Sequence, residues 1–385
     1  MLWVGACTSS VGTWMQVVAQ NWLVFQMAGA FFLALDSFMG QIPIFLFSLV
    51  GGVVADRFDR RMLLIGSQIV QLTCAFSLAA LVAFGTVHVW HILTLSFIVG
   101  CAQSIGGPAY QALIPTLVDS KDLPNAIALN SIQFNLARVI GPTLGGLALT
   151  GLGAAWCFSL NGVSFLAVIV SLFLLHIRNI PARTGASMFS TMKDGLRFIR
   201  NREGMTPLIV LAFTMTLLGI PLITFLPVVA RDVFKGGATT FTWMLCISGV
   251  GAVCGALIVA AFGNISNKGQ VALTTLTVLG ALIAAFGMSR SLWLSCVFLF
   301  LAGAALIAVF AMISSLVQLI APDEMRGRVM SVYNVAFRGG MPIGSLISGA
   351  LIKSLGIPAV LAGNGVLLVF LGLYFLFLQR RVVAL

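Results

Sequence analysis

The chain has 385 residues, of which 60% are hydrophobic and only 8% are charged, and its formal net charge is +11. A soluble domain carries roughly a quarter charged residues, so this composition excludes an ordinary soluble protein. Apolar segments of about 20 residues, the length needed to cross a bilayer, follow one another along the chain. We therefore expect an all-α membrane protein.

Breaking the apolar runs at charges and at Gly/Pro clusters predicts twelve membrane-spanning helices in two groups of six. The first group is expected near residues 2–26, 31–54, 63–84, 91–112, 126–150 and 155–177. The second group is expected near residues 206–229, 239–262, 271–288, 292–315, 329–352 and 357–379. An even number of crossings places both termini on one side of the membrane. The excess of lysine and arginine in the loops on that side predicts that it is the cytoplasmic side.

The longest polar stretch, residues 178–205, separates an N-terminal bundle of residues 1–177 from a C-terminal bundle of residues 206–385. Apolar side chains in this linker fall on one helical face: Met188, Phe189, Met192, Leu196 and Ile199. The pattern predicts a cytoplasmic linker that is either an amphipathic helix on the inner membrane surface or a plain connector. The basic inner loops account for the net charge, so we expect no nucleic-acid partner.

An internal repeat supports two related halves. In each half an arginine stands four residues before a proline within a span, as Arg138 and Pro142 in the first half and Arg338 and Pro342 in the second. Such repeats usually indicate pseudo-symmetric halves that meet at a central site. A charge at membrane depth is costly unless it is paired or hydrated, so both arginines are candidates for substrate binding or coupling. The alternative is a hydrogen bond inside each arginine's own bundle.

A charged loop joins the second and third predicted spans and carries Gly52, Asp56, Arg57, Arg60 and Arg61. We expect Gly52 to let two helix ends approach closely. The Asp56 carboxylate can accept hydrogen bonds from a helix N-terminus, where the helix dipole is positive. The loop is therefore either an inner gate contact or only a positive-inside anchor.

The run from Gly52 to Arg61 resembles the signature of the loop between helices two and three in the major facilitator superfamily, although Asp59 replaces the usual glycine. Part of the fifth predicted span resembles a motif of antiporters in that superfamily, at Arg138, Gly141, Pro142, Gly145 and Gly146. Shorter stretches resemble the siderophore and drug exporters, the branch that includes the enterobactin exporter, at residues 12–16, 230–233 and 322–329. The resemblance covers nearly the whole chain.

This resemblance implies the major facilitator fold, with two pseudo-symmetric six-helix bundles in the cytoplasmic (inner) membrane of a bacterium. It implies that Asp56 contacts the start of the eleventh helix, near residues 327–329, as an inner gate. It also implies that the fifth helix packs against the eighth, and that helices one, four, seven and ten line the substrate cavity. In this sequence the seventh span contains Pro221 and Pro227, which predict kinks.

Polar side chains within the spans are the candidates for substrate binding or coupling: Gln16, Gln20, Gln103, Tyr110 and Asn334, together with Ser314, Ser315 and Gln318 at the end of the tenth span. Asp36 is the only acid plainly within a span. A proton-coupled exporter needs a carboxylate whose protonation responds to burial and opening, and Asp36 is the best-placed one. The alternative for Asp36 is an outer helix cap.

Together these features predict a multi-pass secondary active transporter with no enzymatic activity. We expect it to export an amphipathic small molecule of the drug or siderophore type by proton antiport and alternating access. Its partners are then a small-molecule substrate and the lipid bilayer, and we expect a monomer that uses a proton gradient and has no cofactor and no metal. The alternatives are a lysophospholipid or other lipid flippase, a uniporter of the same fold and, more remotely, a non-transporting membrane regulator.

Overall fold

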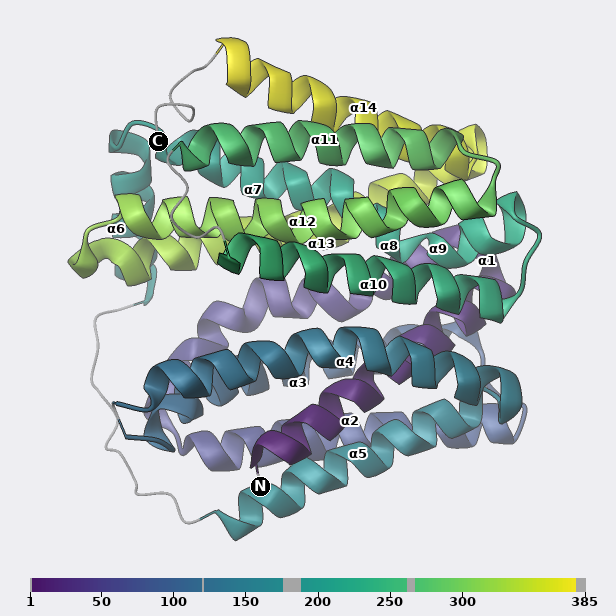
Figure 1. The fold of residues 1–385 in the computed structure, drawn as a ribbon. Helices are drawn as coiled ribbons and strands as arrows, with labels where there is room; N and C mark the ends of the chain where they lie inside the picture. The colour runs from purple at the N-terminus through teal and green to yellow at the C-terminus, as the bar shows by residue number, and fades with distance from the viewer. Residues whose placement is uncertain (1, 120, 176–187, 262–266, 379–385) are drawn as a thin grey trace. The chain divides into compact units, whose positions relative to one another are not determined.

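The computed structural model describes residues 2–119, 121–175, 188–261 and 267–378, and every element in these ranges is a helix (Figure 1). Among the described residues, ten helical segments are long and apolar enough to cross a membrane, which confirms the all-α membrane class. Helices suit this environment because they satisfy their backbone hydrogen bonds internally. Predictions for residues 176–187, 262–266 and 379–385 fall outside the described residues.

Contacts divide the chain into two compact units. The first contains Met1–Gly185 together with Ala238–Cys246, and the second contains Ala186–Gly237 and Ile247–Leu385. Each unit is described by itself. The predicted domain boundaries at residues 177 and 205 stay predictions.

The first unit is built from the helices α1 (Leu2–Arg57), α2 (Arg60–Ala83), α3 (Val89–Leu113), α4 (Leu123–Gly151) and α5 (Ala154–Leu174). The long helix α1 covers the first two predicted spans and is broken at Gly29, where φ is 80° and ψ is −171°. Residues other than glycine rarely adopt this backbone conformation. Because α1 has two arms and α4 is 29 residues long, the structure is consistent with the predicted twelve crossings.

Glycines bring the helices of the first unit close together. A Cβ atom at Gly12 of α1 would collide with Ser164 and Asn161 of α5. In the second arm of α1, a Cβ at Gly51 would collide with the backbone of Ser104 in α3. Small residues at such crossings let polar side chains of neighbouring helices reach one another inside the bundle.

The second unit contains α7 (Met205–Gly219), the short helices α8 (Pro221–Thr224) and α9 (Leu226–Val228), and most of α10 (Ala238–Ala261), followed by α11 (Lys268–Met288), α12 (Leu292–Ile320), α13 (Asp323–Leu355) and α14 (Ile357–Leu373). The seventh predicted span is interrupted just before Pro221 and again at Phe225, two residues before Pro227. The kinks were predicted at these prolines because proline cannot donate the helical hydrogen bond. Helix α11 packs between α12 and α14, and α13 packs against α7 (Figure 1).

Helix α6 (Met188–Asn201) lies within the predicted linker and packs against α13. A Cβ at Gly195 would collide with the carbonyl oxygen of Arg328, so the two backbones are in close contact. Asp194 pairs with Arg328 at 3.0 Å beside this contact, and Ile199 is only 5% exposed. One face of α6 is therefore buried in protein. Its placement on the membrane surface stays a prediction.

Candidate functional site

A chain of hydrogen bonds runs through the interior of the first unit and ends at Asp36. Asn161 Nδ2 donates to Gln16 Oε1 (2.6 Å), and Gln16 Nε2 donates to Gln20 Oε1 (3.3 Å). Gln20 Nε2 donates to Asp36 Oδ2 (2.7 Å) and to Ser96 Oγ (2.9 Å). Ser96 Oγ donates to Asp36 Oδ1 (2.5 Å). These five residues, named here the Asp36 relay, join both arms of α1 to α3 and α5.

The Asp36 side chain is only 4% exposed, and the donors described for its two oxygens are neutral. No ion pair to Asp36 occurs among the described residues. A buried, ionised carboxylate without a cation is costly, so a membrane-embedded acid of this kind is by default a functional candidate. Its described partners are side chains rather than backbone N–H groups, so the helix-cap alternative does not fit.

Two other candidates hold helices of the first unit together. The Tyr110 hydroxyl of α3 lies 3.0 Å from Asn130 Oδ1 and 3.3 Å from Gln133 Oε1, and it can donate to either of these α4 side chains. Gln133 Nε2 donates to Ser10 Oγ of α1 (2.9 Å). Gln103 Nε2 of α3 donates to Gln71 Oε1 of α2 (3.3 Å). These contacts give both side chains a structural role, and substrate binding by them stays a prediction.

The two arginines within spans have different surroundings. The Arg138 guanidinium lies over the Trp14 ring, 5.8 Å from its centroid, a cation–π contact within the first unit. In the second unit the side chains of Arg338 and Asn334 are exposed. The hydrogen bond that the structural alternative requires is not found for either arginine among the described residues. Roles of these three residues in binding or coupling stay predictions.

The basic residues of the charged loop bind carbonyl groups at helix ends. Arg60 Nη1 donates to the carbonyl of Ala112 (3.1 Å), near the end of α3. Arg61 Nη2 donates to the carbonyl of Phe173 (3.0 Å), near the end of α5. The last carbonyls of a helix have no partner in their own helix and carry the negative end of its dipole. Both arginines therefore connect the charged loop to the ends of neighbouring helices, in addition to giving the loop positive charge.

Asp59 stands where the resembled signature has glycine, and it caps α2. Its Oδ1 accepts from the backbone N–H groups of Arg61 (2.8 Å) and Met62 (3.2 Å). Aspartate is a preferred residue at this position because it satisfies otherwise unpaired N–H groups. The side chain of Asp56 lies outside the described residues, so the inner gate contact stays a prediction.

The expectation of a close helix approach at Gly52 was wrong. A Cβ at Gly52 would meet no atom within 4 Å, whereas one at Gly51 would collide with the backbone of Ser104. Successive residues of a helix point about 100° apart, so a shift of one position changes the helix face completely. The nearby Arg57 side chain is exposed.

The antiporter-like motif forms a close-packing face on α4. Gly141 and Gly145 lie against α1, where a Cβ at either would collide with Trp14 or Met15. A Cβ at Gly146 would collide with Thr242 in the part of α10 that belongs to the same unit. The buried Pro142 lies inside α4 between these glycines.

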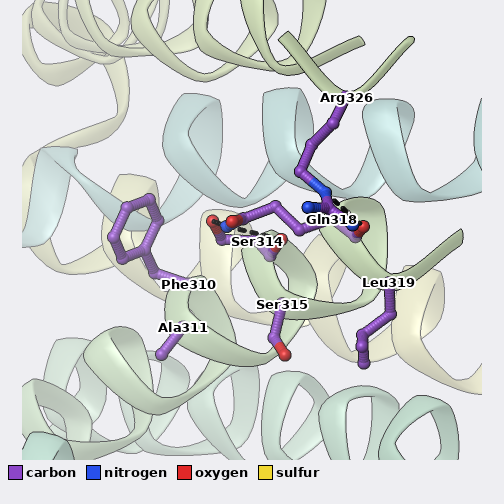
Figure 2. Close-up of a pocket in the computed structure, with 7 residues that line it drawn as sticks. All are labelled: Phe310, Ala311, Ser314, Ser315, Gln318, Leu319 and Arg326. Carbon is purple, nitrogen blue, oxygen red and sulfur yellow. Dashed lines mark hydrogen bonds between the residues drawn. The ribbon is translucent and has the colours of Figure 1, made fainter. Parts of the chain in front are cut away.

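A pocket of about 440 Å³ lies in the second unit. Figure 2 shows the residues that line it. The pocket is lined by residues of α12 and α13: Phe310, Ala311, Ser314, Ser315, Gln318, Leu319 and Arg326. Ser314, Ser315 and Gln318 are the polar residues named for the end of the tenth span. Arg326 Nε donates to the backbone carbonyl of Gln318 (3.2 Å), and Arg326 pairs with Asp323 at 2.6 Å. The pocket thus combines a phenyl ring with amide and hydroxyl groups, and its one arginine is already engaged.

Sequence reasoning missed two members of the Asp36 relay, Ser96 and Asn161. Both are buried, with exposures of 9% and 2%. The available signal was an amide or hydroxyl group inside an apolar span, where polar side chains form hydrogen bonds between helices. Asn161 is such a residue, because it stands alone between Leu160 and Gly162 in α5.

Comparison with known proteins gives consistent matches over the whole chain. The family model described as transmembrane secretion effector matches residues 1–384. The chain is 25% identical to the multidrug efflux pump Tap of Mycolicibacterium fortuitum, over 97% of this chain and 94% of that protein. It is 21% identical to the staphyloferrin A transporter of Staphylococcus aureus, over 96% of this chain and 94% of that protein. A crystal structure of a POT family transporter with a bound peptide conjugate superposes with a TM-score of 0.79 over 99% of this chain and 96% of that one, and at 11% identity this is a likeness of fold.

Proposed function

Because the chain belongs to the transmembrane secretion effector family of the major facilitator superfamily, we propose that it exports amphipathic small molecules of the drug or siderophore type in exchange for protons. Family membership and the helical membrane fold make it a secondary transporter rather than an enzyme. The cargo class is supported by relatives named for multidrug efflux and for staphyloferrin A.

The observation that carries the proton-exchange proposal is the environment of Asp36. Its carboxylate is buried, and its described partners are the neutral side chains of Gln20 and Ser96. A proton is the smallest ligand that removes the uncompensated charge. As alternating access opens and closes this region to water, the cost of burying the charged form changes, and so does the tendency to bind a proton.

The pocket in the second unit and the Arg138–Trp14 contact support an amphipathic cargo. The pocket places the Phe310 ring near the hydroxyl and amide groups of Ser314, Ser315 and Gln318. Such mixed linings suit molecules with an apolar body and a few polar groups.

We further propose a monomer in a bacterial cytoplasmic membrane, with both termini in the cytoplasm and with no cofactor or nucleic-acid partner.

Purified protein in proteoliposomes tests this function directly. A panel of one macrolide, one siderophore and one lysophospholipid is offered with and without an imposed pH gradient. We expect the gradient to drive accumulation of the macrolide or the siderophore. Lysophospholipid movement alone supports a flippase, and transport indifferent to the gradient supports a uniporter. Absence of all transport supports a regulator, and each of these three results contradicts the proposal.

A further inference from the structure

All hydrogen bonds of the Asp36 relay point in one direction. Asn161 donates to Gln16, Gln16 donates to Gln20, and Gln20 donates to Asp36. A side-chain amide has a donor NH₂ at one end and an acceptor oxygen at the other, so the orientation of each amide fixes that of the next. An ionised carboxylate only accepts, and the relay therefore matches Asp36 in its charged form.

The starting point of the relay is held rigidly. The Ser164 hydroxyl, one turn further along α5, lies 2.7 Å from the backbone carbonyl oxygen of Asn161 and 3.1 Å from Asn161 Oδ1, and it can donate to either. Asn161 Nδ2 is directed at Gln16. Gly12 of α1 lies directly against Ser164 and Asn161, so the two helices pack closely at this level. Asn161 is 2% exposed, so its amide lies buried inside the bundle.

Protonation of Asp36 places a donor where the relay already supplies donors. If the proton is on Oδ1, the Ser96 hydroxyl must accept from Asp36 as well as from Gln20, and its own hydrogen loses the acceptor that the structure gives it. If the proton is on Oδ2, Gln20 must turn its amide, and then Gln16 must turn as well, against the amide that Asn161 presents. A buried polar group left without its partner costs more than an ordinary hydrogen bond contributes, so this reversal is unfavourable.

Few other charged or titratable groups occur on the helices packed against α1. On α2 to α5 the described ones are Arg60, Arg61, Cys74, His91, Cys101, Tyr110, Arg138 and Cys157, and α1 itself adds Cys7 and Arg57. None of them is a described hydrogen-bond or ion-pair partner of Asp36. Among the described residues, the hydrogen-bond donors of the relay are therefore the main influence on whether Asp36 binds a proton.

We propose that Asn161 is a positioning residue that acts on Asp36 through Gln16 and Gln20 and sets the proton concentration at which transport switches. This inference rests on the proposed proton exchange. It makes α5, which contributes no side chain to the carboxylate itself, part of the coupling machinery. Loss of Asn161 frees the amide of Gln16 to turn, which makes protonation of Asp36 easier.

The test measures the pH dependence of transport for Asn161→Leu and for Gln16→Met, two changes that remove one amide each and keep similar side-chain volume. We expect the midpoint of the pH profile to move to higher pH by about one unit in both variants. The double variant should show no larger shift, because residues acting through one network are not additive. Gln71→Met, which removes a buried amide outside the relay, should keep the wild-type midpoint.

A purely structural role for Asn161 predicts a lower maximal rate with an unchanged midpoint, and that result overturns the proposal. So does an additive shift in the double variant. A measurement that does not require transport distinguishes failure of the Asn161 proposal from failure of the proposed export function. The infrared C=O band of the protonated Asp36 carboxyl, isolated by subtracting the Asp36→Asn spectrum, should follow the same shift with pH. An unchanged band midpoint in both single variants contradicts the relay even where transport is absent.

Discussion

The side-chain amide of Gln20 donates to the Asp36 carboxylate across 2.7 Å, although 16 residues separate the two in the chain. A continuous helix places residues so spaced about 24 Å apart along its axis. The break at Gly29 lies between them and lets the second arm of α1 turn back beside the first. The geometry of the Asp36 relay therefore depends on Gly29, although Gly29 is not itself a member of the relay.

Gly29→Ala is expected to destabilise the protein by about 1–3 kcal/mol, because its φ of 80° is strained for any other residue. A Cβ at Gly29 meets no atom within 4 Å, so backbone strain is the only cost. Gly66→Ala is the matched control, since Gly66 lies inside α2 with equally open space. Thermal unfolding in detergent measures both. Equal melting temperatures for the two variants contradict the strain argument.

Arg61→Gln should lower stability by about 1–2 kcal/mol, because a charge-assisted hydrogen bond to the Phe173 carbonyl is lost. Arg57→Gln makes the same change of charge in the same loop at an exposed side chain. It should change stability by less than about 0.5 kcal/mol. Chemical or thermal unfolding of both variants is the measurement. A similar loss in both means that only the loop charge matters.

The cap at Asp59 predicts a ranked series. Asp59→Ala removes the acceptor for the N–H groups of Arg61 and Met62 and should cost about 1 kcal/mol. Asp59→Gly, which restores the residue of the resembled signature, should cost only a few tenths of a kcal/mol. Melting temperatures in the order aspartate, glycine, alanine are expected. Alanine at least as stable as glycine disproves the capping role.

Spans and breaks were predictable from the sequence because the bilayer imposes apolar runs of a known length, and charges, glycine and proline mark their ends. The prediction therefore placed a boundary between residues 26 and 31, where the break at Gly29 lies, and kinks at Pro221 and Pro227. The relay was not predictable. Ser96 and Asn161 join Asp36 and Gln16 only through the rotation of α3 and α5 against α1, which a single sequence does not encode visibly. The helix crossing lies at Gly51 rather than at the predicted Gly52 for the same reason, because helix rotation decides which glycine faces the neighbouring helix.

Docking of α6 on α13 should depend on backbone contact more than on charge. Asp194 and Arg328 are both partly exposed, so Asp194→Asn should cost at most about 1 kcal/mol. Gly195→Ala places a methyl group against the Arg328 carbonyl and should cost about 1–3 kcal/mol. Limited proteolysis at the ends of α6 reports the docking. Greater cleavage in Asp194→Asn than in Gly195→Ala reverses the expected order and contradicts the packing argument.

Substrate-driven proton movement is the most direct test of proton exchange at Asp36. Proteoliposomes loaded with a pH-sensitive dye receive a pulse of the macrolide or siderophore that the wild type transports, and Asp36→Asn is compared at equal protein content. The account predicts a pH change for the wild type and none for Asp36→Asn, while Asp36→Asn still exchanges labelled substrate down its gradient. Equal pH changes from both proteins would show that Asp36 carries no coupled proton.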